Sequence, residues 1–295
     1  MQRKIRNPAN ALFFALISIL LWSSFATLGQ RLRHVPPLLL VGLALGIGSL
    51  ISLRNAKSWF ARPSILLFGT GCMFGYHFLL FLALRLSPPI EANLLNYLWP
   101  LLIVLLSGAL LPGHRLEPRH VAGALVAFLG AALAITDGRL SFDPAHLPGY
   151  LMAVGAAITW AFYSVLTKRF SPFPTAAVGG FCFFSSLLAL AGHAVLEPPF
   201  RPAGSDWAQI LALGLGPMGL AFYAWDAALK RGDPRVIGAL SYLTPVLSTA
   251  LLALFGMNAV LSLWSIAALV LIVGGAGISS IGIFTKRPRT RISRP

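Results

Sequence analysis

The sequence predicts an all-α integral membrane protein in which ten transmembrane helices form two inverted-topology five-helix repeats around a central cavity. Three observations favour this fold class: the composition, a series of apolar segments and an internal repeat. Of the 295 residues, 57% are hydrophobic and only 11% are charged, whereas about a quarter of the residues of a soluble protein carry charge. Such a chain is expected to lie in a lipid bilayer.

Ten apolar segments follow one another, and each is close to the roughly 20 residues that a helix needs to cross the hydrocarbon core. They span approximately 10–30, 36–53, 64–84, 89–111, 119–136, 148–167, 174–196, 207–229, 234–256 and 262–284. Pro, Gly or charged residues separate them, which is typical of turns between helices. The first segment follows a basic stretch but has no small-residue cleavage site, so we interpret it as a retained helix.

The Lys and Arg residues predict the orientation. With the N-terminus inside the cell, 18 of the 23 basic residues fall in inner connections or tails, and 5 fall in outer ones. The positive-inside rule then places both termini in the cytoplasm, with 1–9 and 285–295 as basic cytoplasmic tails. The net charge of +15 is thus a sign of topology, and we expect no nucleic-acid partner.

An internal repeat divides the chain. Shifting residues 69–102 by 145 positions matches 11 of 34 residues without a gap. The matches include Gly and Pro positions, which chance similarity between Leu-rich segments does not explain. We therefore expect two homologous five-helix units, 10–136 and 148–284. Because five is odd, the second unit enters the bilayer from the opposite side, an arrangement typical of secondary transporters with a midplane substrate site.

Three tryptophans on different segments, Trp22, Trp99 and Trp160, fall at a similar depth near the midplane, judged from a rise of about 1.5 Å per residue. Membrane tryptophans usually prefer the interfaces. Packing between helices is one explanation for tryptophans near the midplane. The other is a stacking and cation–π surface for a substrate, and the common depth favours it.

The stretch Asn96-Tyr97-Leu98-Trp99-Pro100 has a counterpart in Ser241-Tyr242-Leu243-Thr244-Pro245. Pro100 and Pro245 each remove a backbone hydrogen bond in mid-helix and free a carbonyl. Their recurrence in both halves favours hinges for alternating access over simple packing kinks. Asn96 and Ser241 are expected on the cavity side of the two helices.

Several ionisable or aromatic residues lie inside apolar segments. His77, beside Tyr76, is a candidate because ionisable groups are costly in hydrocarbon; it could bind a carboxylate, relay a proton or donate to a neighbouring carbonyl. For Asp226, an ion pair with Lys230 at i+4 is favoured over proton coupling. Glu91 begins a helix on the outer side, where capping is the plainer role and gating the alternative. The remaining aromatic residues that could line the cavity or merely pack are Tyr163, Tyr223, Trp225 and Tyr242.

Motifs of other function classes are absent from the sequence. There is no HExxH, P-loop or GxSxG motif and no Lys or Arg at mid-membrane depth. We therefore expect neither an intramembrane hydrolase nor an ATP-driven pump, and no cofactor or metal ion. Cys72 and Cys182 lie in apolar segments and are expected to be free thiols.

These features resemble a known family. Ten helices in two inverted halves, with Pro in the fourth and ninth helices, resemble the drug/metabolite transporter superfamily of the EamA-domain type. The string Asn96–Pro100 preceded by Ile90-Glu91-Ala92, together with Ser241–Pro245, is similar to aromatic amino acid exporters of the YddG type. The resemblance implies a bacterial inner-membrane protein that exports amino acids through a central cavity. The cavity wall that it implies includes Trp22, Tyr97, Trp99, Trp160 and Tyr242, with Tyr76 and His77 nearby.

The leading hypothesis is a monomeric, gradient-driven exporter of aromatic and other neutral amino acids. Substrate rings would stack on the three midplane tryptophans, while Tyr76, His77, Asn96 and Tyr97 would bond the polar ends; Tyr163, Ser241 and Tyr242 complete the expected site. An exporter of drug-like or apolar metabolites is the alternative. A non-transporting receptor or an intramembrane enzyme is disfavoured by the inverted repeat.

Overall fold

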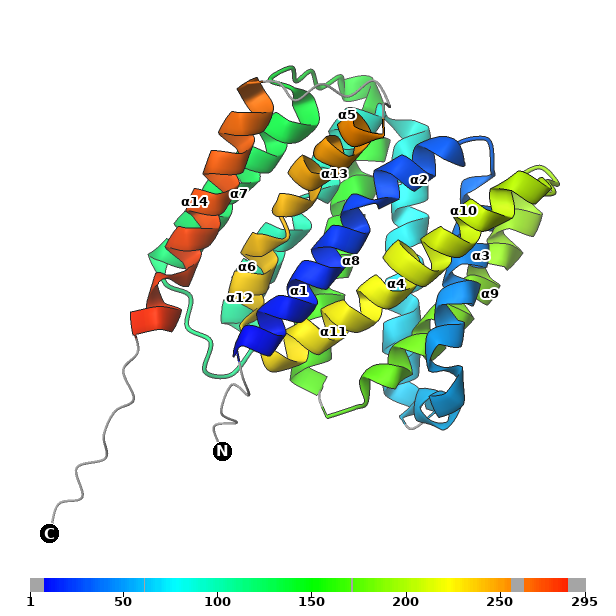
Figure 1. Cartoon of the computed structure of the whole chain (residues 1–295), viewed down its shortest axis with the longest axis horizontal. Helices are drawn as coiled ribbons and strands as arrows, with labels where there is room; N and C mark the ends of the chain where they lie inside the picture. Colours follow the sequence, from blue (N-terminus) through cyan, green and yellow to red (C-terminus); the bar gives the residue numbers. More distant parts are fainter. Residues whose placement is uncertain (1–7, 61, 171, 256–262, 286–295) are drawn as a thin grey trace, which may run out of the picture.

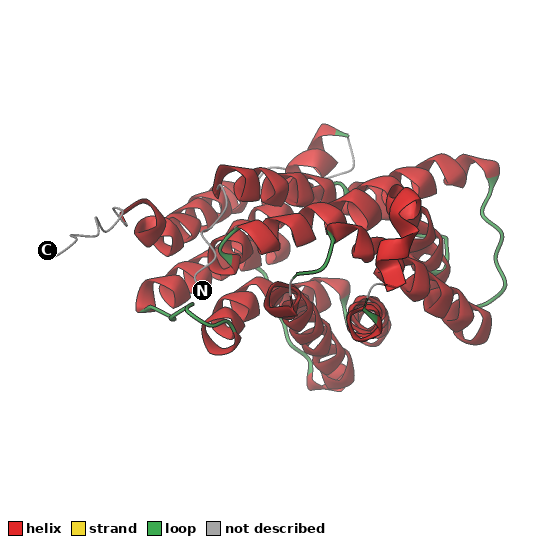
Figure 2. Ribbon diagram, turned by 90° about the horizontal axis from the view of Figure 1, so that it is seen from below, coloured by secondary structure: helices red, strands yellow, loops and turns green. Residues whose placement is uncertain are grey.

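The computed structural model describes residues 8–60, 62–170, 172–255 and 263–285, and within these ranges the regular structure is entirely helical (Figures 1 and 2). A helix bonds its own backbone N–H and C=O groups, which is what a chain in hydrocarbon requires. The α-helices are α1 (Pro8–Ser23), α2 (Phe25–Arg31), α3 (Pro37–Ser49), α4 (Pro63–Leu86), α5 (Pro89–Asn96), α6 (Trp99–Leu110), α7 (Pro118–Thr136), α8 (Leu147–Phe170), α9 (Val178–Leu196), α10 (Gly204–Leu215), α11 (Ala221–Arg231), α12 (Pro234–Leu240), α13 (Leu243–Leu254) and α14 (Leu263–Thr285). The short elements are the 3₁₀ helices η1 (Leu50–Phe60), η2 (Pro144–His146) and η3 (Thr175–Ala177) and the π-helix η4 (Gly216–Leu220).

Nine stretches of the described residues are long and apolar enough to cross a membrane, and Leu263–Ser279 within α14 is a shorter apolar helix. The beginning of α1 and the end of α14 lie at the same end of the bundle (Figure 1), as an even number of crossings produces. The all-α membrane class is thus confirmed. The count of ten crossings and the inverted relation of the halves stay predictions, and most of the two expected basic tails lies outside the described residues.

Several expected segments are interrupted or extended. A break at Ser24 separates α1 from α2, and the π-helix η4 separates α10 from α11. The segment expected to end at residue 53 continues to Phe60 as η1, a stretch of 3₁₀ turns that is kinked at Ser52 and Asn55. The buried Trp59 anchors this extension, because its indole N–H donates to the Ser52 hydroxyl over 2.9 Å and Ser52 donates to the Ala176 carbonyl.

Proline marks where several helices begin. It is the first residue of α3, α4, α5, α7 and α12. The backbone N–H of the first residue of a helix has no acceptor within the helix, so proline, which lacks this N–H, loses no hydrogen bond there. The fixed φ angle of proline also suits a helix. The Pro residues that separate apolar segments in the sequence therefore set the starts of these helices.

The helices form one layered bundle (Figure 1). Helix α14 runs beside α7 at one edge, and α3 runs beside α9 at the other. Between them, α1 packs on α11, α4 packs on α8, and α6 contacts both α8 and α12. The helices that carry the candidate residues therefore lie in the interior of the bundle.

The pair α7 and α14 is held by small residues that let the two backbones approach closely. A Cβ built on Gly275 of α14 would lie 2.6 Å from the backbone nitrogen of Ala127 on α7. A Cβ on Gly130 of α7 would lie 2.8 Å from the carbonyl oxygen of Ala268 on α14. No side chain larger than hydrogen fits at these two positions without separating the helices.

We expect Gly275→Leu to lower the free energy of unfolding by about 1–3 kcal/mol, as overpacking of a tight interface usually does. Gly277→Leu on the same helix is the matched control, since a Cβ there meets nothing within 4 Å. The melting temperatures of both variants in detergent measure the difference. Equal melting temperatures would contradict the close packing of α7 on α14.

Candidate functional site

Side chains from five helices meet in the interior of the bundle, and we call this group the aromatic cluster. Helices α1, α4, α6, α8 and α11 contribute to it. Its members are Trp22, Tyr76, His77, Trp99, Trp160, Tyr163, Phe222 and Trp225. The three tryptophans that the sequence placed at a common depth are thus brought together by the fold.

Trp22 is the hub of the aromatic cluster. Its ring centroid lies 6.1 Å from that of Trp99, 5.9 Å from Trp160 and 5.1 Å from Trp225. The first two contacts are edge-to-face, the geometry in which the positive edge of one ring meets the negative face of another. Trp99 and Trp160 are buried, at 6% and 3% exposure. The rings therefore contact one another directly.

On its α4 and α8 side the aromatic cluster combines stacked rings with polar groups. The rings of Trp160 and Tyr163 stack at 5.0 Å, and Tyr76 lies 5.2 Å from Trp160. His77 lies 5.0 Å from Tyr76, edge to face. The interior surface is therefore aromatic, with hydroxyl and imidazole groups at its margin.

A hydrogen bond fixes the position of Trp22. Its indole N–H donates to the Pro217 carbonyl in the π-helix η4 over 3.1 Å. One turn earlier on α1, the Ser18 hydroxyl donates to the Ala221 carbonyl over 3.0 Å. Helix α1 is therefore tied to the break between α10 and α11, and π-helical segments of this kind often occur at functional sites.

The sequence predicts a binding role for neither of two members of the aromatic cluster, Trp225 and Phe222. Trp225 is fully buried, and its indole N–H donates to the Ser164 hydroxyl over 3.0 Å. Phe222 lies 5.5 Å from Trp160. Their separation by three residues places both on one face of α11. That spacing, just after Pro217, is the signal that could have identified Phe222.

Polar atoms beside the aromatic cluster are incompletely bonded. The Asn96 amide donates to the Tyr76 hydroxyl over 3.3 Å. The Asn96 carbonyl oxygen and the Tyr163 hydroxyl are buried and have no hydrogen-bond partner among the described residues. A buried polar atom without a partner costs about 1–3 kcal/mol. These atoms are therefore available to bond a polar ligand.

His77 is held by its own helix. The imidazole Nδ1 donates to the Met73 carbonyl over 2.7 Å, one turn back on α4. This is the third of the three roles considered for His77, donation to a neighbouring carbonyl. In the neutral ring, Nε2 then stays an acceptor.

Tyr97, Ser241 and Tyr242 lie outside the aromatic cluster. Tyr242 is fully buried with its ring 6.1 Å from Phe128, and Tyr97 packs in the same second group. The Ser241 hydroxyl donates to the Gly238 carbonyl of its own helix over 2.6 Å. A substrate-binding role for these three residues stays a prediction.

The two prolines expected to be hinges lie at interruptions within two longer helical stretches, Pro89–Leu110 and Pro234–Leu254. Helix α5 ends at Asn96 and α6 begins at Trp99, so Pro100 lies in the first turn of α6. Likewise α12 ends at Leu240 and Pro245 lies in the first turn of α13. Leu98 and Ser241 keep right-handed helical φ and ψ at these points, so the interruptions fall inside the helical stretches as expected, and a hinge role stays a prediction.

The breaks of the two halves contact each other. The Tyr242 hydroxyl accepts the backbone N–H of Leu101 in the first turn of α6 over 3.1 Å. A Cβ on Gly238 would lie 3.2 Å from the Pro100 carbonyl oxygen, so α12 approaches the start of α6 closely. The two proline-containing segments are therefore in direct contact.

Asp226 forms the expected ion pair. Its Oδ2 lies 2.7 Å from the Lys230 ammonium and accepts from the Thr175 hydroxyl over 2.6 Å. The Lys230 ammonium also donates to the Phe173 carbonyl over 2.9 Å. The ion-pair interpretation is thus confirmed. Glu91 lies in the first turn of α5, with one carboxylate oxygen buried and unpartnered among the described residues.

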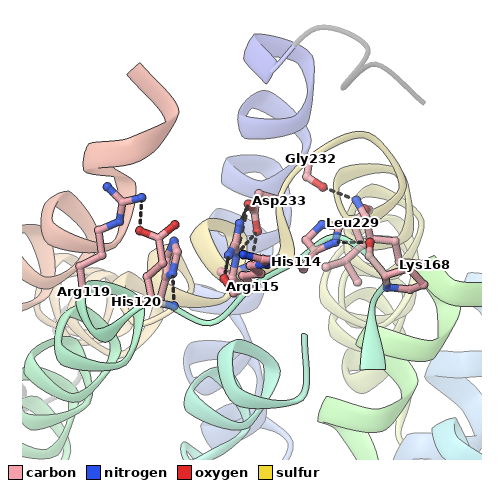
Figure 3. Close-up of polar contacts among 11 residues, drawn as sticks. His114, Arg115, Arg119, His120, Lys168, Leu229, Gly232 and Asp233 are labelled. Atoms are coloured by element: carbon pink, nitrogen blue, oxygen red, sulfur yellow. Dashed lines mark hydrogen bonds and ion pairs between the residues drawn. The ribbon is translucent and has the colours of Figure 1, made fainter. Parts of the chain in front are cut away.

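A polar network joins the end of α8, the α11–α12 junction and the α6–α7 connection at the end of the bundle where α1 begins (Figure 3). At the end of α8, the Lys168 ammonium donates to the carbonyls of Leu229 and Gly232, at the end of α11. At the start of α12, Arg235 binds Asp233 through two nitrogens and donates to the Arg115 carbonyl in the connection between α6 and α7. These contacts hold the ends of α8, α11 and α12 and the α6–α7 connection together.

Asp233 stays ionised in this network. Burial raises the pKa of its carboxyl, but the hydrogen bonds and the charge of Arg235 outweigh burial, and the pKa lies below its ordinary value. The bidentate geometry of an Arg–carboxylate pair adds to its strength. The junction between α11 and α12 is therefore fixed at neutral pH.

Comparison with known proteins identifies the family. The model of the EamA-like transporter family matches residues 9–136 and 147–281. The chain belongs to the EamA-like transporter family. It is therefore a multi-pass membrane transporter and not an enzyme, and the resemblance seen in the sequence is confirmed.

Individual relatives match almost the whole chain. It is 44% identical over 284 residues to the aromatic amino acid exporter YddG of Ancylobacter novellus, which covers 93% of this chain and 98% of that protein. It is 28% identical to a probable amino-acid metabolite efflux pump of Salmonella typhimurium, with 95% of this chain and 98% of that protein covered. One solved crystal structure of a protein superposes with a TM-score of 0.88 at 43% identity, over 94% of this chain and 99% of that one.

We expect Asp226→Asn to lower the free energy of unfolding by about 3–5 kcal/mol, because it leaves the buried Lys230 ammonium without its counter-charge. The melting temperature in detergent measures the loss. The double variant Asp226→Asn with Lys230→Met removes the uncompensated charge and should recover part of the stability. A single variant as stable as wild type would contradict a stabilising ion pair.

Proposed function

We propose that this transporter is a gradient-driven exporter of aromatic and other neutral amino acids that works by alternating access in the bacterial inner membrane. The observation that carries the proposal is the aromatic cluster, to which five helices contribute and in which Trp22 contacts Trp99, Trp160 and Trp225. The names of the relatives, an aromatic amino acid exporter and a probable amino-acid metabolite efflux pump, support the same substrate class.

The chemistry of the aromatic cluster suits an amino acid with an apolar side chain. A substrate ring that enters between Trp22 and Trp99 would replace ring contacts by equivalent ones, since edge-to-face and offset geometries are similarly favourable. The Asn96 carbonyl oxygen would accept from the α-ammonium group, and the Tyr163 hydroxyl would donate to the carboxylate; both atoms lack partners among the described residues. The ammonium group would also be attracted to the tryptophan faces.

Alternating access would use the two contacting breaks. At Tyr97–Leu98 and at Ser241–Tyr242 the regular helical hydrogen-bond pattern is interrupted shortly before a proline, which would let the two parts of each helix bend. The polar network around Lys168 and Asp233 would close the cytoplasmic end while the opposite end is open. In this proposal the units 10–136 and 148–284 are the inverted repeats, both termini are cytoplasmic, and one monomer carries the whole pathway.

The substrate proposal is tested by uptake of labelled Phe, Trp, Leu and Ala into proteoliposomes. We expect Trp99→Ala to weaken apparent affinity for Phe and Trp about tenfold, from the loss of one aromatic contact of about 1.5 kcal/mol, with a smaller effect on Leu. Trp207→Ala is the matched control, because Trp207 is 42% exposed on α10 and lies outside the aromatic cluster.

Two results would overturn the proposal. One is amino acid flux no higher than in empty liposomes, which would favour the alternative of drug-like or apolar metabolites. The other is an equal loss of Phe flux in Trp99→Ala and Trp207→Ala, which would remove the aromatic cluster from recognition. Because such vesicles contain no nucleotide, uptake along a substrate gradient also tests whether a gradient alone drives transport.

The gating part of the proposal makes a separate prediction. Lys168→Met removes two charged hydrogen bonds to α11 and should favour opening of the cytoplasmic end about tenfold, if the pair contributes on the order of 1.4 kcal/mol. The readout is the rate at which a membrane-impermeant maleimide labels Thr167→Cys, a position with 1% exposure, after Cys72 and Cys182 are replaced by Ala. Lys57→Met, at an exposed cation of η1, is the control. An unchanged labelling rate in Lys168→Met would exclude a gating role for the network.

A further inference from the structure

A surface cavity of about 580 Å³ lies between the beginning of α4 and the end of α8. Its lining residues are Arg62, Ser64, Ile65, Phe68, Arg169, Phe170 and Pro172. The cavity lies at the end of the bundle that the basic residues assign to the cytoplasm. None of the lining residues belongs to the aromatic cluster or to the proposed substrate pathway, so the cavity needs an explanation of its own.

The charged part of the cavity is purely cationic. Arg62 donates one N–H to the Phe170 carbonyl over 3.5 Å, and Arg169 donates one N–H to the Leu110 carbonyl. A guanidinium group has five N–H donors, so each arginine keeps further donors for a ligand. The sequence has no Asp or Glu between residues 50 and 90 or between 144 and 196. The two elements that form the cavity therefore carry no carboxylate that could neutralise these arginines.

The other part of the cavity is apolar and continues toward the lipid-facing surface. Phe68 and Phe170 meet edge to face at 5.4 Å, and Ile65 is buried beside them. Phe170 is 38% exposed, and the neighbouring Leu67 on α4 is 77% exposed. Two arginines and three apolar side chains therefore line one cavity, and the exposed Leu67 lies beside it in the sequence of α4.

We infer that this cavity binds an anionic phospholipid from the cytoplasmic leaflet, with its headgroup phosphate between Arg62 and Arg169. Arginine suits this task because its planar fork donates two parallel hydrogen bonds to phosphate oxygens. Basic pockets between transmembrane helices on the cytoplasmic side are typical headgroup sites, and the volume lies within the range of small-molecule sites.

The apolar wall distinguishes a lipid from a free phosphate ion. Ile65, Phe68 and Phe170 give an acyl chain a surface to pack on, whereas an inorganic ion gains nothing from them. A bound lipid contacts α4 and α8 together. These are the helices that carry Tyr76 and Trp160, so the lipid joins the ends of two helices that meet again in the aromatic cluster.

The test is native mass spectrometry of the full chain in detergent, titrated with phosphatidylglycerol and, separately, with phosphatidylcholine. We expect wild type to retain phosphatidylglycerol in preference to phosphatidylcholine. One surface cation strengthens attraction to anionic lipid by about fivefold, so the double variant Arg62→Gln with Arg169→Gln should bind phosphatidylglycerol about 30-fold more weakly.

A matched control separates the cavity from general surface charge. Arg54→Gln with Lys57→Gln removes the same charge from exposed positions of η1 that do not line the cavity, and it should leave phosphatidylglycerol binding within about twofold of wild type. Equal weakening in the two double variants would overturn the site. Binding of inorganic phosphate by wild type without retention of phosphatidylglycerol would overturn the choice of lipid over free ion. Equal retention of both lipids by wild type would overturn the charge argument.

Discussion

Backbone groups at the breaks of helices must find partners inside the bundle, because water does not reach them in hydrocarbon. Here the partners come from the other half of the chain. Trp22 donates to the Pro217 carbonyl, Ser23 donates to the Thr244 carbonyl over 3.3 Å, and the Tyr242 hydroxyl accepts the Leu101 N–H. The residues before position 136 thus satisfy breaks in the residues after 148, and the reverse also holds. Removal of one such partner leaves a buried polar group at a cost of about 1–3 kcal/mol.

This constraint explains why the candidate site and the breaks lie together. Trp22 both bonds the π-helix η4 and packs against Trp99, Trp160 and Trp225. Because Trp22 contacts both the π-helix η4 and the aromatic cluster, a change in the conformation of η4 would move the ring that packs against the other tryptophans. The aromatic cluster is therefore mechanically connected to the segments at which the helices can bend.

Much of the fold follows from simple sequence patterns. Apolar length and the positions of proline locate most of the apolar spans, because bilayer thickness and the missing N–H of proline act locally. The depth of Trp22, Trp99 and Trp160 also follows from the sequence, since helical rise is regular. The family membership that the Asn96–Pro100 string suggested is confirmed by the family match over both halves of the chain.

Other features depend on contacts between helices, which local patterns do not contain. Phe222 and Trp225 of α11 meet Trp22 beside the π-helix η4; their spacing of three residues suggests a shared face but does not name the ring that they meet. Tyr97 and Trp99 are two residues apart and therefore face different sides, and the neighbouring helices that each of them meets are known only from the folded chain. The cavity beside Arg62 combines residues separated by more than a hundred positions, so it exists only in the folded chain.

The hydrogen bond between Tyr242 and Leu101 also has a consequence for biogenesis. Residue 101 is made and inserted long before residue 242, so the start of α6 enters the bilayer without its final acceptor. The same order applies to Trp22 and Pro217. The first half is therefore expected to stay conformationally open during translation, and the arrival of the last helices completes the structure of the earliest ones.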